Sequence, residues 1–179
     1  MVKTAYELAD WQGYLTHREI DALKRVVKQL PKSPIIVKIG AGAGTDTLAI
    51  LEERKDALIF SVDINTTNDE ISTNEHLRLV ETGYDKTGNV IRIWGDSKVV
   101  CKMWPLEWGV DMLIVDGDHL EPGITGDIDG WLPKVWSDGF VAFHDYGSHV
   151  WPNVKLVVDE KMKDYIVVEH VDTMRIFRV

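Results

Sequence analysis

The stretch Ile35-Ile36-Val37-Lys38-Ile39-Gly40-Ala41-Gly42-Ala43-Gly44-Thr45 decides the fold. Its first five residues predict a buried strand, and the alternating glycines predict a sharp turn into a helix. Such a turn lets a ligand touch the backbone, and the helix that follows offers free N–H groups. The G-x-G-x-G spacing differs from the G-x-G-x-x-G of dinucleotide-binding folds. We therefore favour a nucleotide-type ligand over the plainer alternative, a tight turn that only needs small residues.

Short apolar runs alternate with helical segments along the chain. The pattern predicts strands over residues 35–39, 58–62, 90–94, 112–115, 140–143, 165–169 and 174–179, and helices over residues 16–30, 45–53, 68–82, 123–135 and 154–162. Apolar strands that alternate with helices are typical of an α/β fold with a mostly parallel sheet. A tight turn between the last two strands favours an antiparallel hairpin. We expect one domain over residues 1–179, with an N-terminal helical segment, residues 1–33, and an α/β core, residues 34–179.

The composition narrows the classes of function. The 179 residues include 20 Lys and Arg against 29 Asp and Glu, so the net charge of −9 makes nucleic acid and membranes poor partners. A single cysteine, Cys101, excludes an intrachain disulfide and weighs against a cysteine-based zinc site. No apolar run approaches the ~18 residues of a transmembrane helix. Residues 1–13 lack the pattern of a signal peptide, so we expect a cytoplasmic protein.

Polar residues follow the second and third predicted strands, where α/β proteins bind ligands. Asp63 lies about 20 residues beyond Gly44, the offset expected of an acid that binds a ribose diol. A carboxylate can accept from both hydroxyl groups, although a helix N-cap is the alternative for Asp63. Asp96 and Ser97 follow the third strand. A helix cap is the simpler interpretation there, and contact with an adenine amino group is the alternative.

Ionisable residues also follow the fourth and fifth predicted strands. Asp116 and His119 come after the fourth, and His144 and Asp145 come after the fifth. If these strands are neighbours, Asp116, His144 and Asp145 converge on one point. Two carboxylates suit Mg²⁺ or Mn²⁺, and the imidazole tilts the preference toward Mn²⁺, Fe²⁺ or Zn²⁺. For any one of these residues alone, a cap or turn role is the alternative.

Together these motifs resemble those of a known enzyme family. Residues 37–45 resemble motif I of class I S-adenosylmethionine (SAM)-dependent methyltransferases, and residues 62–64 resemble their acidic motif II. One branch is matched in particular, the small O-methyltransferases akin to catechol and macrocin O-methyltransferases and the cephalosporin-hydroxylase-like proteins, through residues 114–119, 130–133 and 138–146. The resemblance implies a Rossmann-like sheet of seven strands, with the last strand antiparallel.

The resemblance also implies where the ligands lie. SAM is expected against Gly40, Ala41, Gly42, Gly44, Thr45, Asp63, Ile64, Asp96, Ser97 and Asp116. Mg²⁺ or another divalent cation is expected on Asp116, His144 and Asp145, although the family commonly has Asp-Asp, Asp-Asn or Glu-Asp in place of His144-Asp145. Lys38 is a second departure, because the family usually has an acid there that helps hold the amino group of SAM. A cation opposes that ammonium group unless it turns outward or meets the carboxylate.

We therefore predict an enzyme that methylates a hydroxyl group of a small molecule, with help from the cation. His119 or His144 is the expected base, since imidazole titrates near neutrality. His144 is alternatively a substrate contact, which would leave the cation to Asp116 and Asp145. The aromatic residues expected at the pocket mouth or at a homodimer contact are Trp11, Tyr14 and Trp151. An NAD-dependent oxidoreductase, a non-catalytic binding protein and a metal-dependent enzyme that transfers no methyl group are the alternatives.

Overall fold

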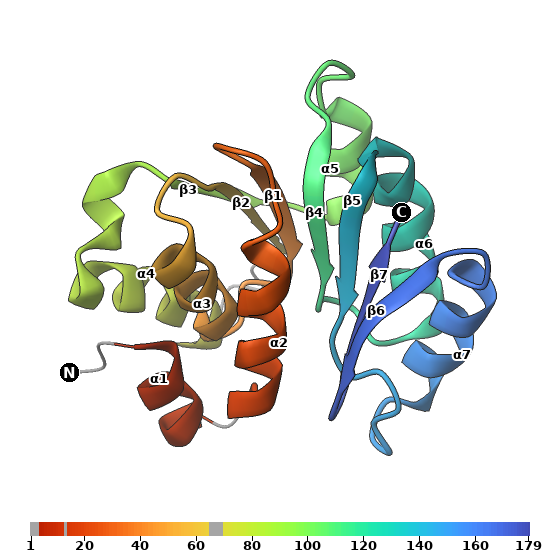
Figure 1. The fold of residues 1–179 in the computed structure, drawn as a ribbon, viewed down its shortest axis with the longest axis horizontal. Helices are drawn as coiled ribbons and strands as arrows, with labels where there is room; N and C mark the ends of the chain where they lie inside the picture. Colours follow the sequence, from red (N-terminus) through yellow and green to blue (C-terminus); the bar gives the residue numbers. More distant parts are fainter. Residues whose placement is uncertain (1–3, 13, 65–69) are drawn as a thin grey trace.

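Seven strands form one sheet in the order β3-β2-β1-β4-β5-β7-β6 (Figure 1). The computed structural model describes residues 4–12, 14–64 and 70–179, of which residues 12 and 70–74 are described for the backbone alone. The first five strands run parallel, whereas β7 is antiparallel to both of its neighbours. The predicted sheet is thereby confirmed. The strands are β1 (Ile35–Ile39), β2 (Leu58–Asp63), β3 (Val90–Trp94), β4 (Val110–Val115), β5 (Val135–Phe143), β6 (Ile166–Val171) and β7 (Met174–Arg178).

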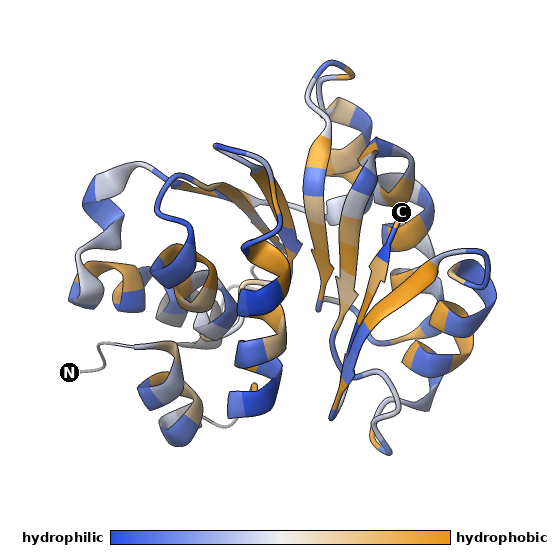
Figure 2. Ribbon diagram, in the orientation of Figure 1, coloured by the Kyte–Doolittle hydropathy of each residue, from blue (hydrophilic) through white to orange (hydrophobic). Residues whose placement is uncertain are grey.

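Helices cover both faces of the sheet (Figure 1). One face carries α1 (Ala5–Gln12), α2 (His17–Val27), α3 (Thr45–Glu53) and α4 (Glu70–Thr82), and the other carries α5 (Ser97–Met103), α6 (Glu121–Trp131) and α7 (Pro152–Lys161). Figure 2 shows largely apolar strands between helices that mix apolar and polar residues. No helix in the described part of the chain is long and apolar enough to cross a membrane.

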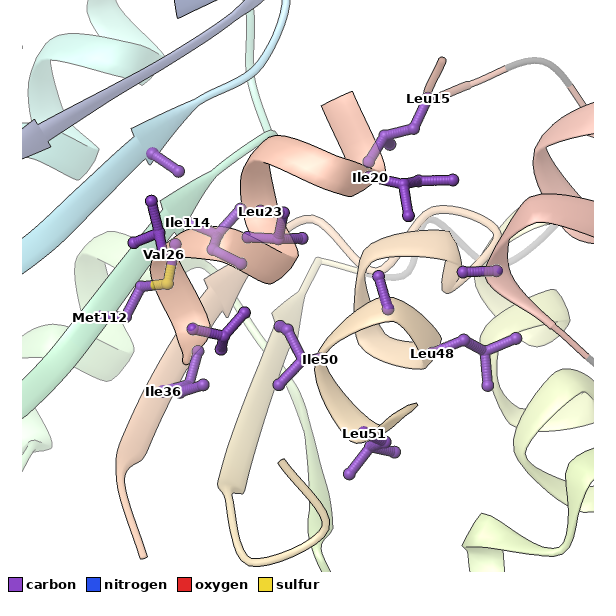
Figure 3. Packing of buried hydrophobic residues seen from close by; sticks show 14 of the residues in the cluster. Leu15, Ile20, Leu23, Val26, Ile36, Leu48, Ile50, Leu51, Met112 and Ile114 are labelled. Atoms are coloured by element: carbon purple, nitrogen blue, oxygen red, sulfur yellow. The ribbon is translucent and has the colours of Figure 1, made fainter. Parts of the chain in front are cut away.

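Alternate residues of the strands enter two apolar clusters, one on each face of the sheet. Ile36 of β1 packs with Met112 and Ile114 of β4 and with residues of α2 and α3 (Figure 3). Val37 points the other way and joins the cluster beneath α5, α6 and α7. Since successive side chains of a strand point to opposite faces, Lys38 lies on the same face as Ile36. This places its ammonium group under α3 and α4.

Three predicted boundaries differ by three or more residues. The helix predicted over residues 16–30 is too long, because α2 stops at Val27. The helix predicted over residues 123–135 is wrong at its end, because α6 stops at Trp131 and a 3₁₀ turn, η2 (Leu132–Lys134), follows. Pro133 has no N–H to continue the helix. The fifth strand was predicted too short, because β5 already starts at Val135. The helix predicted over residues 68–82 is confirmed as α4 from Glu70 onward, and residues 68–69 lie outside the described residues.

Candidate functional site

The carboxyl ends of β1 to β4 surround a cavity, called cavity A here. The strand order reverses between β1 and β4, which is where an open α/β sheet forms a ligand-binding crevice. Cavity A has a volume of about 350 Å³, within the range of roughly 300–1,000 Å³ that is typical of small-molecule sites. Its walls are the glycine turn and the residues directly after β2, β3 and β4.

The glycine turn needs two of its glycines for different reasons. Gly40 has a φ of +89°, and a Cβ there would lie 2.0 Å from the carbonyl oxygen of Asp116. Any side chain at this position would therefore push the turn away from the end of β4. Gly42 has a φ of +50°, and no atom of the described residues lies within 4 Å of the place its Cβ would take. The space over Gly42 is open, so a ligand can approach the backbone.

Asp63 and Asp96 both fix the walls of cavity A. Asp63 Oδ2 accepts a hydrogen bond of 2.7 Å from the N–H of Ala41, which ties the glycine turn to the end of β2. Asp96 is the N-cap of α5 and accepts from the N–H of Lys98 at 2.8 Å, so its predicted cap role is confirmed. Both residues also line the cavity. A structural role and a ligand-binding role are compatible at each position.

Five carboxylates line cavity A: those of Asp63, Asp96, Asp116, Asp118 and Asp127. The one cation among the lining residues is Lys98, which lies 3.2 Å from Asp96. Carboxylates accept from hydroxyl and amino groups, and they repel the pyrophosphate of a dinucleotide. Cavity A therefore suits a neutral or cationic nucleoside better than NAD.

A second cavity, cavity B, meets cavity A at Gly42 and Asp116, which line both. Its volume is about 370 Å³. The N-terminal end of α3 forms one wall, and Tyr14 and Trp151 contribute half-exposed aromatic side chains, as predicted for the pocket mouth. Trp11 does not line this cavity, and its ring lies against the guanidinium of Arg78. The remaining wall holds the ionisable residues Asp116, His119, His144 and Asp145.

These four ionisable residues form one cluster, because β4 and β5 pair directly and their ends lie side by side. His144 Nδ1 lies 3.2 Å from Asp116 Oδ1 and 3.3 Å from Asp145 Oδ2. His119 Nε2 lies 2.9 Å from the same Asp145 oxygen. Asp145 has a φ of 56°, a left-handed conformation that is unfavourable for a residue with a side chain and is often found at functional sites.

The opposite side of His144 is held by a buried acid from α2. Glu19 Oε2 lies 3.8 Å from His144 Nε2, and Thr173 Oγ1 lies 3.4 Å from the same nitrogen. Glu19 itself accepts from the N–H groups of Thr16 and Thr173, both at 2.8 Å. Burial favours the neutral acid, but the nearby His144 and the hydrogen bond from Thr16 outweigh it and lower the pKa of Glu19. His144 therefore stands between an anion on each side.

The carboxylates set the protonation of both imidazoles. Burial acts to lower the pKa of His144, but Asp116, Asp145 and Glu19 raise it to about 12. Asp116 and Asp145 raise the pKa of His119 to about 9. His119 also stacks on Trp151, with ring centroids 4.8 Å apart. Both imidazoles are thus cationic at neutral pH when only protein groups surround them.

The cluster also fits a divalent cation. One ligand atom each from Asp116, His144 and Asp145 lies within 4.8 Å of the others. His144 turns Nδ1 toward the two carboxylates and Nε2 toward Glu19, as metal-binding histidines do when an acid orients the ring. This donor set suits Mn²⁺, Fe²⁺ or Zn²⁺ better than Mg²⁺.

Lys38 takes neither of the positions considered from the sequence. Its side chain points inward and is 2% exposed. Its ammonium donates to Asp46 Oδ1 at 2.5 Å, to the Ala41 carbonyl at 2.7 Å and to Glu75 Oε1 at 3.3 Å. Burial acts to lower the pKa of Lys38, but Asp46 and Glu75 raise it above its ordinary value. The positive charge is therefore neutralised within the protein.

Comparisons with known proteins now identify the family. A family model described as a methyltransferase domain matches residues 37–146, more than half of the chain. The chain belongs to this methyltransferase family. The assignment confirms the predicted enzyme class, a SAM-dependent methyltransferase. A search of curated proteins finds no match.

Solved structures confirm the class I fold of this methyltransferase. A protein proposed to be an O-methyltransferase from Klebsiella pneumoniae superposes with a TM-score of 0.74 at 16% identity, covering 98% of this chain and 87% of that one. A proposed methyltransferase from Streptococcus mutans in complex with SAH superposes with a TM-score of 0.64 at 14% identity, covering 92% of this chain and 99% of that one. A proposed rRNA methylase from Clostridium thermocellum superposes with a TM-score of 0.66 at 15% identity, covering 100% of both chains. Because these neighbours carry names that point to different acceptors, the shared fold does not identify the acceptor.

The structure brings every residue predicted for SAM to the walls of the two cavities of the methyltransferase. Cavity A takes Gly40, Asp63, Ile64, Asp96 and Ser97, cavity B takes Ala41, Gly44 and Thr45, and both take Gly42 and Asp116. Their contacts with SAM stay predictions. Sequence reasoning missed three residues that shape the site: Glu19, Asp46 and Asp127. Only Glu19 carried a local signal, the capping box with Thr16, and that signal says nothing of His144.

Proposed function

We propose that the protein transfers the methyl group of SAM to a hydroxyl group of a small molecule. The observation that carries this proposal is the junction of the two cavities at Gly42 and Asp116. A nucleoside-sized, carboxylate-lined cavity there opens directly onto the cluster of Asp116, His119, His144 and Asp145. Methyl transfer is an in-line displacement, and it requires this adjacency of donor and acceptor sites.

The residues of cavity A suit the nucleoside part of SAM. Asp63 stands where it would accept from the ribose hydroxyls, and the open space over Gly42 lets the donor contact the backbone. The acidic wall complements the positive sulfonium centre, which is the group that SAM supplies for methyl transfer. No cationic side chain other than Lys98 lines the cavity within the described ranges, and that one is paired with Asp96.

The acceptor would bind in cavity B, next to the ionisable cluster. A divalent cation on Asp116, His144 and Asp145 would lower the pKa of the acceptor hydroxyl and favour the neutral form of His119. Of the two imidazoles, His119 stands at the mouth of cavity B against Trp151, whereas His144 is enclosed by carboxylates. We therefore assign proton removal to His119 and positioning to His144. Tyr14 and Trp151 offer aromatic surface to the acceptor.

The proposal is tested by ligand binding and by label transfer. SAM should bind the Mn²⁺-loaded protein in a calorimetric titration, and NAD should not. Methyl-labelled SAM should then label small hydroxyl compounds from a panel of phenols, catechols, sugars and carboxylic acids. Base-stable label identifies an ether, whereas base-labile label identifies an ester of a carboxylic acid. Absence of SAM binding, or label found only in an added RNA, would overturn the proposal.

Changing Asp63 to alanine should weaken SAM binding by about tenfold or more, since hydrogen bonds to charged groups contribute about 1.5–3 kcal/mol. The loss has two sources, the missing acceptor in cavity A and the untied N–H of Ala41. Isothermal titration of SAM measures it. Asp85→Ala, at an exposed site on η1 (Tyr84–Thr87), is the matched control and should bind SAM as the wild type does. Equal affinities of the two variants would contradict the assignment of Asp63.

Three further expectations from the sequence stay predictions. The acceptor is expected to be a small molecule, because the acidic chain has no basic surface excess to hold a nucleic acid. A cytoplasmic location and a homodimer are likewise expected. Gel filtration and light scattering of the purified protein measure its oligomeric state.

A further inference from the structure

We propose that Asp46, held in place by Lys38, binds the ammonium group of SAM, and that Thr45 at the start of α3 binds its carboxylate. The inference rests on the proposed function and deepens it. In the family that the sequence resembles, an acid on the first strand helps to hold the ammonium group of SAM. Here the inference gives this role to an acid on α3. Lys38, which replaces the acid on the first strand, is then a positioning residue that holds Asp46 in place.

Asp46 is a carboxyl group fixed at the wall of cavity B. Burial raises its pKa, and the ammonium of Lys38 opposes this by favouring the charged form. Asp46 lines that cavity while being only 5% exposed. The hydrogen bonds that fix it come from Lys38 Nζ at 2.5 Å and from the N–H of Thr47 at 2.8 Å, and both reach Oδ1. Among the described residues, none donates a further hydrogen bond to Oδ2. One carboxylate oxygen thus anchors the side chain and the other is available to a ligand.

Thr45 supplies the independent sign of a ligand. Thr45 lines cavity B, and its hydroxyl oxygen is buried and has no hydrogen-bond partner within residues 4–12, 14–64 and 70–179. Buried polar groups are rarely left without a partner, so an unpaired hydroxyl at a cavity wall indicates a ligand group. Thr45 is the first residue of α3, and its N-cap Gly44 offers no side chain to the free N–H groups. Hydroxyl and helix N-terminus together suit a carboxylate.

The two groups lie where the amino-acid end of the donor must go. A ligand whose nucleoside occupies cavity A reaches cavity B past Gly42, which lines both. Residues 43–46 form the part of the wall that follows Gly42 in the chain. This part presents an anion, Asp46, next to an anion-binding helix start, and this pair matches the ammonium and carboxylate of an α-amino acid. Lys38 also lines cavity B, but its side chain is only 2% exposed and its ammonium is bound by Asp46, Ala41 and Glu75, so its charge stabilises Asp46.

Two ligands separate this role from a merely structural one. S-adenosylhomocysteine carries the amino-acid end, and 5′-methylthioadenosine lacks it. We expect Asp46→Asn to weaken the binding of S-adenosylhomocysteine at least about tenfold and to leave the binding of 5′-methylthioadenosine as in the wild type. Thr45→Val should show the same selectivity. Calorimetric titrations of both ligands, with melting temperatures of all variants, provide the readout without any assay of methyl transfer.

Glu75→Gln is the matched control. Glu75 also accepts from Lys38 and from the Thr47 hydroxyl, but it is fully buried and lines neither cavity. This variant should lower the melting temperature and keep the affinity ratio of the two ligands. If Asp46→Asn weakens the binding of both ligands equally, or of neither, the inference is overturned. SAM binding by the wild type would still uphold the proposed function. A wild type that binds neither ligand would overturn both.

Discussion

Replacing Lys38 with methionine is expected to lower the free energy of unfolding by about 3–5 kcal/mol, the cost of leaving buried charges without their partner. Asp46 is 5% exposed and Glu75 is fully buried, so water cannot compensate for the lost ammonium. Thr47 Oγ1, 3.2 Å from Lys38 Nζ, would lose a donor as well. Urea unfolding monitored by circular dichroism measures the change.

A triple variant separates the lost pairing from the lost packing. Lys38→Met combined with Asp46→Asn and Glu75→Gln removes the three charges together, and it should recover most of the lost stability because neither carboxylate is left without the ammonium. Lys28→Met breaks the exposed contact with Glu53 at 3.1 Å and should change the stability by no more than about 1 kcal/mol. If Lys38→Met behaves like Lys28→Met, the buried cluster does not stabilise the fold.

Replacing Asp145 with alanine is expected to reduce methyl transfer by about 10²-fold or more, the usual contribution of positioned acid–base groups. Asp145 contacts both imidazoles and is a candidate cation ligand. Binding of S-adenosylhomocysteine should persist, because Asp145 does not line cavity A and is not one of the cavity B residues that we assign to its amino-acid end. Single-turnover transfer from labelled SAM, with and without added Mn²⁺, measures the loss.

The readouts for Asp145 distinguish chemistry from folding. Stimulation by Mn²⁺ should disappear in Asp145→Ala, and EDTA should lower the wild-type rate toward that of the variant. Asp129→Asn removes an acid that pairs with Lys161 on the surface, and it should leave transfer unchanged. Full transfer by Asp145→Ala would refute the role given to the cluster. A wild-type rate that is insensitive to EDTA would refute the cation while leaving the histidines in place.

The sheet was predictable because its signals are local. Each strand carries its own apolar run, and the glycine turn marks the end of β1 in the sequence. The boundary between α6 and β5 was misplaced because Leu132 and Val135 suit a helix as well as a strand, and the turn at Pro133 decides between the two. Helix α1 was missed because it spans only 8 residues, too few to show a clear period.

The candidate site was predictable where residues follow the strand ends directly. Asp116, His144 and Asp145 converge because neighbouring parallel strands end at one edge of the sheet. The environment of Lys38 was not predictable, since its partners come from two helices and lie up to 37 positions away. The same holds for Glu19, which is 154 positions from Thr173. Long-range pairing of polar groups leaves no periodic trace in a single sequence.

The hydrogen bond from the Thr173 N–H to Glu19 limits which segments of the protein can be exchanged with those of a relative. Residues 37–146, the part that matches the family, contain neither Glu19 nor Thr173. Both lie beside His144, so the two ends of the chain together orient a residue of the shared core. A chimera that takes α2 from a relative without a glutamate at this position would leave the Thr173 N–H without its hydrogen-bond acceptor. His144 would then be held less firmly. Exchange of terminal segments among such proteins should therefore succeed only when the N-terminal and C-terminal segments both come from the same protein.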